Sequence, residues 1–188
     1  LDAPVRWISA DTIYNMRDIG GWTTVDGQQV AYGNIYRGGQ LALDLSHELS
    51  YMSDYSYFVF VYLGMKSEIE LRGDIPVHTK TQWNKYLDCV YVSGASYGSI
   101  EGGSASGIFG LNSQHRAMYR DVFALLADED NYPVYFHCSW GADRTGTLAY
   151  LINGLLGVPY EQLAADFELT SFSGSGIRER AAAFDAMH

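Results

Sequence analysis

The sequence predicts an α/β protein in which helices flank a central mixed, mostly parallel sheet. Short runs rich in β-branched and aromatic residues alternate with longer segments whose apolar residues recur at helical spacing. Such alternation is typical of a sheet covered by helices. In addition, 188 residues with 47% hydrophobic content suffice for the core of one domain. We therefore expect a single domain over residues 1–188.

The expected elements follow from these local patterns. We expect one or two short strands within 29–36, and further strands at 65–71, 87–92 and 133–136. Helices are expected at 46–62, 113–127, 145–156, 160–169 and 177–187. Ser46 and Ser113 are the expected N-caps, and Asp26-Gly27 predicts a hairpin turn. The Gly/Ser-rich stretch 93–112 is too long for a plain connector, and it is either a lid over a site or a segment without a role.

The charge balance restricts the partners. Acidic residues outnumber basic ones by 22 to 12, which gives a formal charge of −10. This charge argues against a nucleic acid partner and against stable association with anionic membranes. It also favours a substrate with one phosphate over a densely phosphorylated one, because the overall field repels anions. No apolar run is long enough to predict a transmembrane helix.

The cysteines and the N-terminus are less informative. With two cysteines, a disulfide framework is not expected. Cys89 lies in an apolar run and is either a core residue or a redox partner of Cys138. No cluster of His and Cys has the spacing of metal ligands, so we expect no metal and no cofactor. The chain begins at Leu1, which indicates processing or trimming, and we expect a secreted or cytoplasmic protein, with secretion favoured.

The stretch 137–146 (His-Cys-Ser-Trp-Gly-Ala-Asp-Arg-Thr-Gly) carries the chemistry. It lies between a predicted buried strand and a predicted helix, so its backbone N–H groups meet the positive end of the helix dipole and form an anion cradle. A cysteine in such a field can ionise near neutral pH. Arg144 offers a planar fork of donors that fits two oxygens of a phosphoryl group. The alternative, a structural cysteine before an ordinary helix, leaves the His, the Arg and both glycines unexplained.

This spacing, Cys-x5-Arg-Thr-Gly with His before the Cys, resembles the signature loop of the protein tyrosine phosphatase superfamily. It matches neither the Walker loop nor the rhodanese-type loop. Three further segments resemble a bacterial tyrosine and dual-specificity group that includes secreted mycobacterial and listerial phosphatases. They are 15–22 (Asn-Met-Arg-Asp-Ile-Gly-Gly-Trp), 36–41 (Tyr-Arg-Gly-Gly-Gln-Leu) and 63–72 (Leu-Gly-Met-Lys-Ser-Glu-Ile-Glu-Leu-Arg). The resemblance covers roughly residues 13 to 172 and implies the cysteine phosphatase fold.

The loop residues can be assigned roles by chemical need. Cys138 is the expected nucleophile, Arg144 the phosphate clamp and Asp143 the general acid, although Asp143 could instead only pair with Arg144. The remaining loop residues are expected to bind substrate: His137, Ser139, Trp140, Gly141, Ala142, Thr145 and Gly146. Among these, His137 orients the loop, Thr145 hydrogen-bonds the sulfur, and the glycines permit close approach of the backbone.

Three further carboxylates are candidates for a catalytic or accessory role. Glu70 and Asp74 could act as general acid or activate water, but a solvated loop carboxylate is the alternative for each. Asp18 is a further accessory candidate. Two loop positions depart from the resembled group: Ala142 stands where Lys is usual, which weakens a lipid phosphatase assignment, and Trp140 stands where a small residue is common. Trp140 either stacks on a phenyl ring or packs under the loop.

We therefore expect a cysteine-dependent phosphomonoester hydrolase that acts on phosphotyrosine, with dual specificity as an option. Its expected partner is a phosphorylated protein or a small phosphomonoester. The alternatives are an inositol phosphate or phosphoinositide phosphatase, and a phosphate-binding module without turnover.

Overall fold

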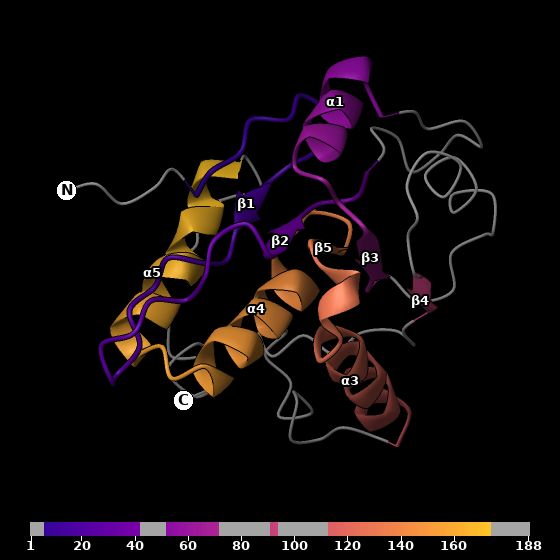
Figure 1. Cartoon of the computed structure of the whole chain (residues 1–188). Coiled ribbons are helices and arrows are strands. Elements are labelled where there is room, and N and C mark those ends of the chain that lie inside the picture. The colour runs from indigo at the N-terminus through magenta and orange to yellow at the C-terminus, as the bar shows by residue number, and fades with distance from the viewer. Residues whose placement is uncertain (1–5, 42–51, 72–90, 94–112, 174–188) are drawn as a thin grey trace.

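A computed structural model describes residues 6–41, 52–71, 91–93 and 113–173 (Figure 1). Within these residues the chain forms one mixed sheet with helices on both faces. Cys89, Asp74, most of the 93–112 stretch and the expected helix 177–187 lie outside the described residues.

The sheet has five strands in the order β1-β2-β5-β3-β4. Their bounds are β1 Arg17–Asp18, β2 Ile35–Gly38, β3 Ser67–Glu70, β4 Tyr91–Ser93 and β5 Val134–His137. β1 pairs with β2 in antiparallel fashion, and the other neighbours are parallel. The prediction of a mixed, mostly parallel sheet is confirmed, and β5, which leads into the signature loop, is its central strand.

The helices are α1 Asp54–Tyr62, α3 Ser113–Leu126, α4 Asp143–Leu155 and α5 Tyr160–Leu169, with short 3-10 helices η2 Glu129–Asn131 and η3 Thr170–Ser173. The bounds predicted for α5 are confirmed. α4 begins two residues earlier than predicted, because Asp143 and Arg144 form its first turn. The predicted start at Ser46 is wrong for α1: Ser53 has an extended backbone, and its hydroxyl accepts from the N–H of Ser56 at 3.0 Å.

The one or two short strands predicted within 29–36 are confirmed only in part. Gln29 forms only an isolated bridge with Thr23, and the regular strand begins at Ile35. The turn between the bridged residues is as predicted, since Gly27 has φ +81° and its N–H donates to the carbonyl of Thr24. That positive φ is a conformation that glycine adopts without strain.

Two apolar clusters cover the two faces of the sheet. One lies under α3 and α4 and includes Phe136, Cys138 and Leu148. The other lies under α1 and includes Phe60 and Tyr135. Figure 1 shows α1 across the sheet from α3 and α4. Side chains alternate along a strand, so neighbours on β5 belong to opposite faces. No helix among the described residues is long and apolar enough to cross a membrane.

Candidate active site

The signature loop runs from the end of β5 to the start of α4. Cys138 directly follows β5, and only 3% of its surface is exposed. Gly141 turns the chain with φ +67°, and a Cβ at this position would lie 2.4 Å from the carbonyl carbon of Gly38. Both the dihedral and the space therefore require glycine here. At Gly146 a Cβ would lie 3.5 Å from the Nη2 atom of Arg37, an ordinary contact, so space does not require glycine there.

The carbonyls of the loop are held by groups outside it. The Cys138 oxygen faces His137 Nδ1 at 3.1 Å, and the Ser139 oxygen accepts from the N–H of Gln40 at 3.0 Å. The Gly141 oxygen accepts from Asn15 Nδ2 at 2.7 Å and from Arg37 Nη2 at 2.8 Å. A trans peptide points its C=O and N–H in opposite directions. The following N–H groups, those of Ser139, Trp140 and Ala142, therefore point away from these partners. Backbone N–H groups gathered in this way are the donors that an oxyanion site uses.

The sulfur lies among donors that favour its anion. Burial raises the pKa of the Cys138 thiol, but the hydroxyl and N–H of Thr145, the charge of Arg144 and the N–H of Gly141 together lower that pKa below its ordinary value. The Thr145 hydroxyl is buried and makes no hydrogen bond of regular geometry among the described residues. Its contribution to the lowered pKa of Cys138 nevertheless indicates that it lies near the sulfur.

Asp143 and Arg144 occupy the first turn of α4 and are partly exposed. Burial raises the pKa of the Asp143 carboxyl, and the neighbouring Arg144 charge only partly opposes this. A raised pKa keeps more of the acid protonated near neutral pH, as a proton donor requires. Arg144 Nη1 donates to the carbonyl oxygen of Leu71 at 3.2 Å, which ties the guanidinium to the end of β3.

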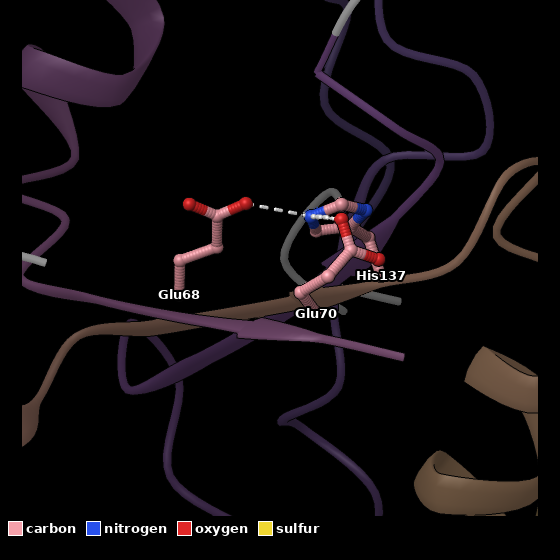
Figure 2. Close-up of side chains that lie close together, drawn as sticks. All are labelled: Glu68, Glu70 and His137. Atoms are coloured by element: carbon pink, nitrogen blue, oxygen red, sulfur yellow. Dashed lines mark hydrogen bonds and ion pairs between the residues drawn. The ribbon is translucent and has the colours of Figure 1, made fainter. Parts of the chain in front are cut away.

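His137 lies between two carboxylates of β3 (Figure 2). Its Nε2 atom is 2.8 Å from Glu68 Oε1 and 3.6 Å from Glu70 Oε2. Its Nδ1 atom faces a carbonyl oxygen, which can only accept. Because each ring nitrogen faces an oxygen, we expect both nitrogens of His137 to carry protons. Glu70 is therefore a buried strand residue facing His137, and the alternative of a solvated loop carboxylate is wrong for it.

The same three side chains bring one potential metal-ligand atom each within 4.8 Å of one another. The 2.8 Å contact between His137 Nε2 and Glu68 Oε1 has the length of a hydrogen bond, so this contact is explained without a metal.

A second buried cluster was not predicted as part of the site. Asp166 of α5 pairs with Arg17 of β1 and with Arg37 of β2. The stretches that contain the two arginines carry the resemblance to the bacterial phosphatase group, but no local pattern predicts that they meet Asp166. Asp18 has a structural role instead. Its carboxylate accepts hydrogen bonds from the N–H groups of Gly20 and Gly33 at 2.7 Å each and so joins two turns.

The strand, loop and helix around Cys138 have the arrangement that the sequence resemblance implied. A family model described as "Tyrosine phosphatase family" matches residues 8–187. The chain therefore belongs to the tyrosine phosphatase family.

Individual relatives agree with this assignment. A protein of Cupriavidus necator named as a tyrosine-protein phosphatase is 26% identical over 181 residues, which cover 85% of this chain and 61% of that relative. A tyrosine-protein phosphatase of Nostoc commune is 34% identical over 53 residues, 28% of this chain and 18% of the relative. The core catalytic domain of the PP-IP phosphatase Siw14 from S. cerevisiae, in complex with citrate, has a similar fold. Its TM-score is 0.54 and its identity 16%, over 80% of this chain and 76% of that domain.

Proposed function

We propose that this chain is a protein-tyrosine phosphatase that works through a phosphocysteine intermediate. One observation carries the proposal: a buried sulfur with a lowered pKa stands at the start of a loop whose N–H groups are turned inward. Such a loop binds the three non-bridging oxygens of a phosphoryl group while the sulfur attacks the phosphorus.

The first step transfers the phosphoryl group to the enzyme. The Cys138 sulfur forms the S–P bond as the P–O bond to the leaving group breaks. Asp143 gives its proton to the departing oxygen, and the phenol leaves. Arg144 and the loop N–H groups stabilise the charge on the non-bridging oxygens.

The second step returns the enzyme to its starting state. Water attacks the phosphocysteine, Asp143 takes the proton of that water, and the S–P bond breaks to release inorganic phosphate and the thiolate. The Thr145 hydroxyl, which faces the sulfur, stabilises the thiolate as it leaves.

An aryl substrate is supported by the rim of the loop. Trp140 is 51% exposed and Tyr14 is 42% exposed, with ring centroids 5.2 Å apart. An exposed aromatic pair beside the loop offers a flat surface to a phenyl ring. Ala142 supplies no positive charge, and the chain carries −10 overall. Electrostatic attraction therefore adds little to the binding of a densely phosphorylated ligand.

Hydrolysis assays test this proposal. The unmodified protein is expected to hydrolyse phenyl phosphate and phosphotyrosine peptides, and Cys138→Ser is expected to abolish the activity. Phosphate binding without turnover would contradict the proposal. Faster turnover of inositol phosphates than of phosphotyrosine peptides, measured at equal concentration, would overturn the substrate assignment and leave the chemistry intact.

A further inference from the structure

The buried cluster of Arg17, Arg37 and Asp166 lies directly behind the loop. Asp166 Oδ1 accepts from Arg17 Nε at 3.1 Å, and Asp166 Oδ2 accepts from Arg37 Nη1 at 2.6 Å. Arg17 Nη2 also donates to the backbone oxygen of Asp166 at 2.9 Å. Both arginines are 0% exposed and Asp166 is 4% exposed. The three side chains therefore interact with little screening by water.

The cluster carries one positive charge more than its carboxylate can neutralise. It contains two guanidinium groups and one carboxylate, and an uncompensated buried charge is costly. Arg37 pairs in register with Phe136, which places Arg37 on the same face of the sheet as the apolar cluster that contains Cys138. The Cys138 thiolate is an anion on this face that acts on Arg37 and can balance the excess charge.

Arg37 also determines how one peptide of the loop is oriented. Its Nη2 atom donates to the Gly141 oxygen at 2.8 Å, and Asn15 Nδ2 donates to the same oxygen at 2.7 Å. Because the peptide is planar, holding this oxygen outward holds the N–H of Ala142 inward. Reversal of this peptide would place a carbonyl oxygen where a phosphate oxygen should bind.

We propose that Arg37 is a positioning residue of the reaction, which pins the Gly141–Ala142 peptide and, together with Arg17 and Asp166, places a net positive charge behind the Cys138 thiolate. This inference deepens the proposed function and rests on it, because it gives the nucleophile a second cation besides Arg144.

The electrostatic environment of Arg37 agrees with this assignment. Burial and the charge of Arg17 lower the pKa of Arg37 to about 10, while Asp166 and Cys138 act in the opposite direction. The interaction between two charges acts on both partners, so the guanidinium that is stabilised by the thiolate also stabilises it. Further titratable groups lie around this part of the sheet. They include Arg6, whose charge acts on Asp166, Tyr119 of α3, Arg144 and Asp143 of α4, Tyr135 and His137 of β5, and Glu68 and Glu70 of β3.

The test measures the pH dependence of Cys138 alkylation by iodoacetamide, which reports thiolate formation without turnover. Arg37→Met leaves Arg17 and Asp166 as a neutral pair, and the midpoint is expected to rise by about one pH unit or more. Asp166→Asn leaves both cations in place, so the midpoint is expected to fall. A merely structural role would not produce shifts of opposite sign. Equal midpoints in Arg37→Met and the unmodified protein would overturn the proposal.

Arg37→Lys separates charge from geometry and is the informative variant if Asp166→Asn does not fold. A lysine keeps the charge but loses the fork, so the alkylation midpoint is expected to stay within a few tenths of a unit, while orthovanadate binds about tenfold more weakly. A midpoint in Arg37→Lys as high as in Arg37→Met would contradict the role of charge.

Lys66→Met is the matched control, because it removes an exposed cation at the start of β3 and is expected to change neither quantity. Circular dichroism checks that each variant is folded. Since alkylation and vanadate binding need no turnover, these results stand apart from the hydrolysis assays of the proposed function.

Discussion

The two faces of the sheet bury charge clusters of opposite sign around one strand. On the face of α4 and α5, Arg17 and Arg37 share the single carboxylate of Asp166. On the face of α1, Glu68 and Glu70 share the single imidazole of His137 (Figure 2). The first cluster carries an excess positive charge, and the second an excess negative charge.

The difference shows how neighbouring residues of one strand and loop can receive opposite electrostatic environments. Glu70 pairs in register with His137, and Arg37 with Phe136, so alternation along the strands sends the two clusters to opposite faces. The cationic cluster favours a thiolate at Cys138. The contacts of the anionic cluster predict a proton on each nitrogen of His137, with which the ring donates to the Cys138 carbonyl.

The largest effect is expected at Gly141, where the cationic cluster holds the loop. Gly141→Ala forces a side chain into a positive φ and against the backbone of Gly38, so several loop N–H groups lose their orientation. We expect kcat/KM on phenyl phosphate to fall about a thousandfold. Gly64→Ala is the control, because Gly64 has φ +68° but open space around its Cβ position. Similar losses in the two variants would mean that backbone strain alone is responsible.

A smaller loss is expected for Asp143→Asn, which leaves both clusters intact and removes the proton donor. Phenyl phosphate, a poor leaving-group substrate, should be hydrolysed about a hundredfold more slowly, and an aryl phosphate with a good leaving group nearly as fast as before. In the unmodified enzyme, kcat/KM should rise as Cys138 ionises and fall as Asp143 loses its proton. This alkaline limb should lie above the range of an ordinary carboxyl, because burial raises the pKa of Asp143, and it should disappear in the variant. Equal slowing of both substrates would assign the acid elsewhere.

Glu68→Gln tests the anionic cluster. The ring loses its 2.8 Å carboxylate partner, so nitrogen NMR at neutral pH should show two protonated nitrogens for His137 in the unmodified protein and one in the variant. The neutral ring donates more weakly to the Cys138 carbonyl, and we expect kcat/KM to fall about tenfold. The exposed Glu129→Gln serves as the matched control. A neutral His137 in the unmodified protein would refute the comparison of the two faces.

The smallest effect is expected at the aromatic rim, which belongs to neither cluster. Trp140→Ala should weaken inhibition by phenylphosphonate about fivefold and leave inhibition by cyclohexylphosphonate unchanged. Tyr62→Ala removes an exposed aromatic ring from α1 and should alter neither inhibition constant. Loss of affinity for both phosphonates in Trp140→Ala would indicate that Trp140 supports the loop instead of contacting the aryl group.

The loop could be predicted because its signals are local. Cys138 and Arg144 lie within one short stretch where a strand leads into a helix. The residues around them are of the types that phosphoryl transfer needs. The cationic cluster could not be predicted in this way, because Arg17 and Arg37 meet Asp166 across 149 and 129 residues. The burial of Glu70 likewise depends on β3 pairing with β5. The start of α1 was misplaced because Ser46 and Ser53 offer the same local capping signal, and tertiary contacts of Ser53 and Ser56 with Asp11 select the second.

The late position of Asp166 has a consequence for synthesis of the chain. A ribosome delivers both arginines first, then the loop, and only afterwards the carboxylate that lies between the two guanidinium groups. A nascent chain that ends after α4 contains every residue of the signature motif, yet its two arginines have no common anion and would repel each other behind the loop. Catalytic competence should therefore appear only once α5 has been translated and has docked.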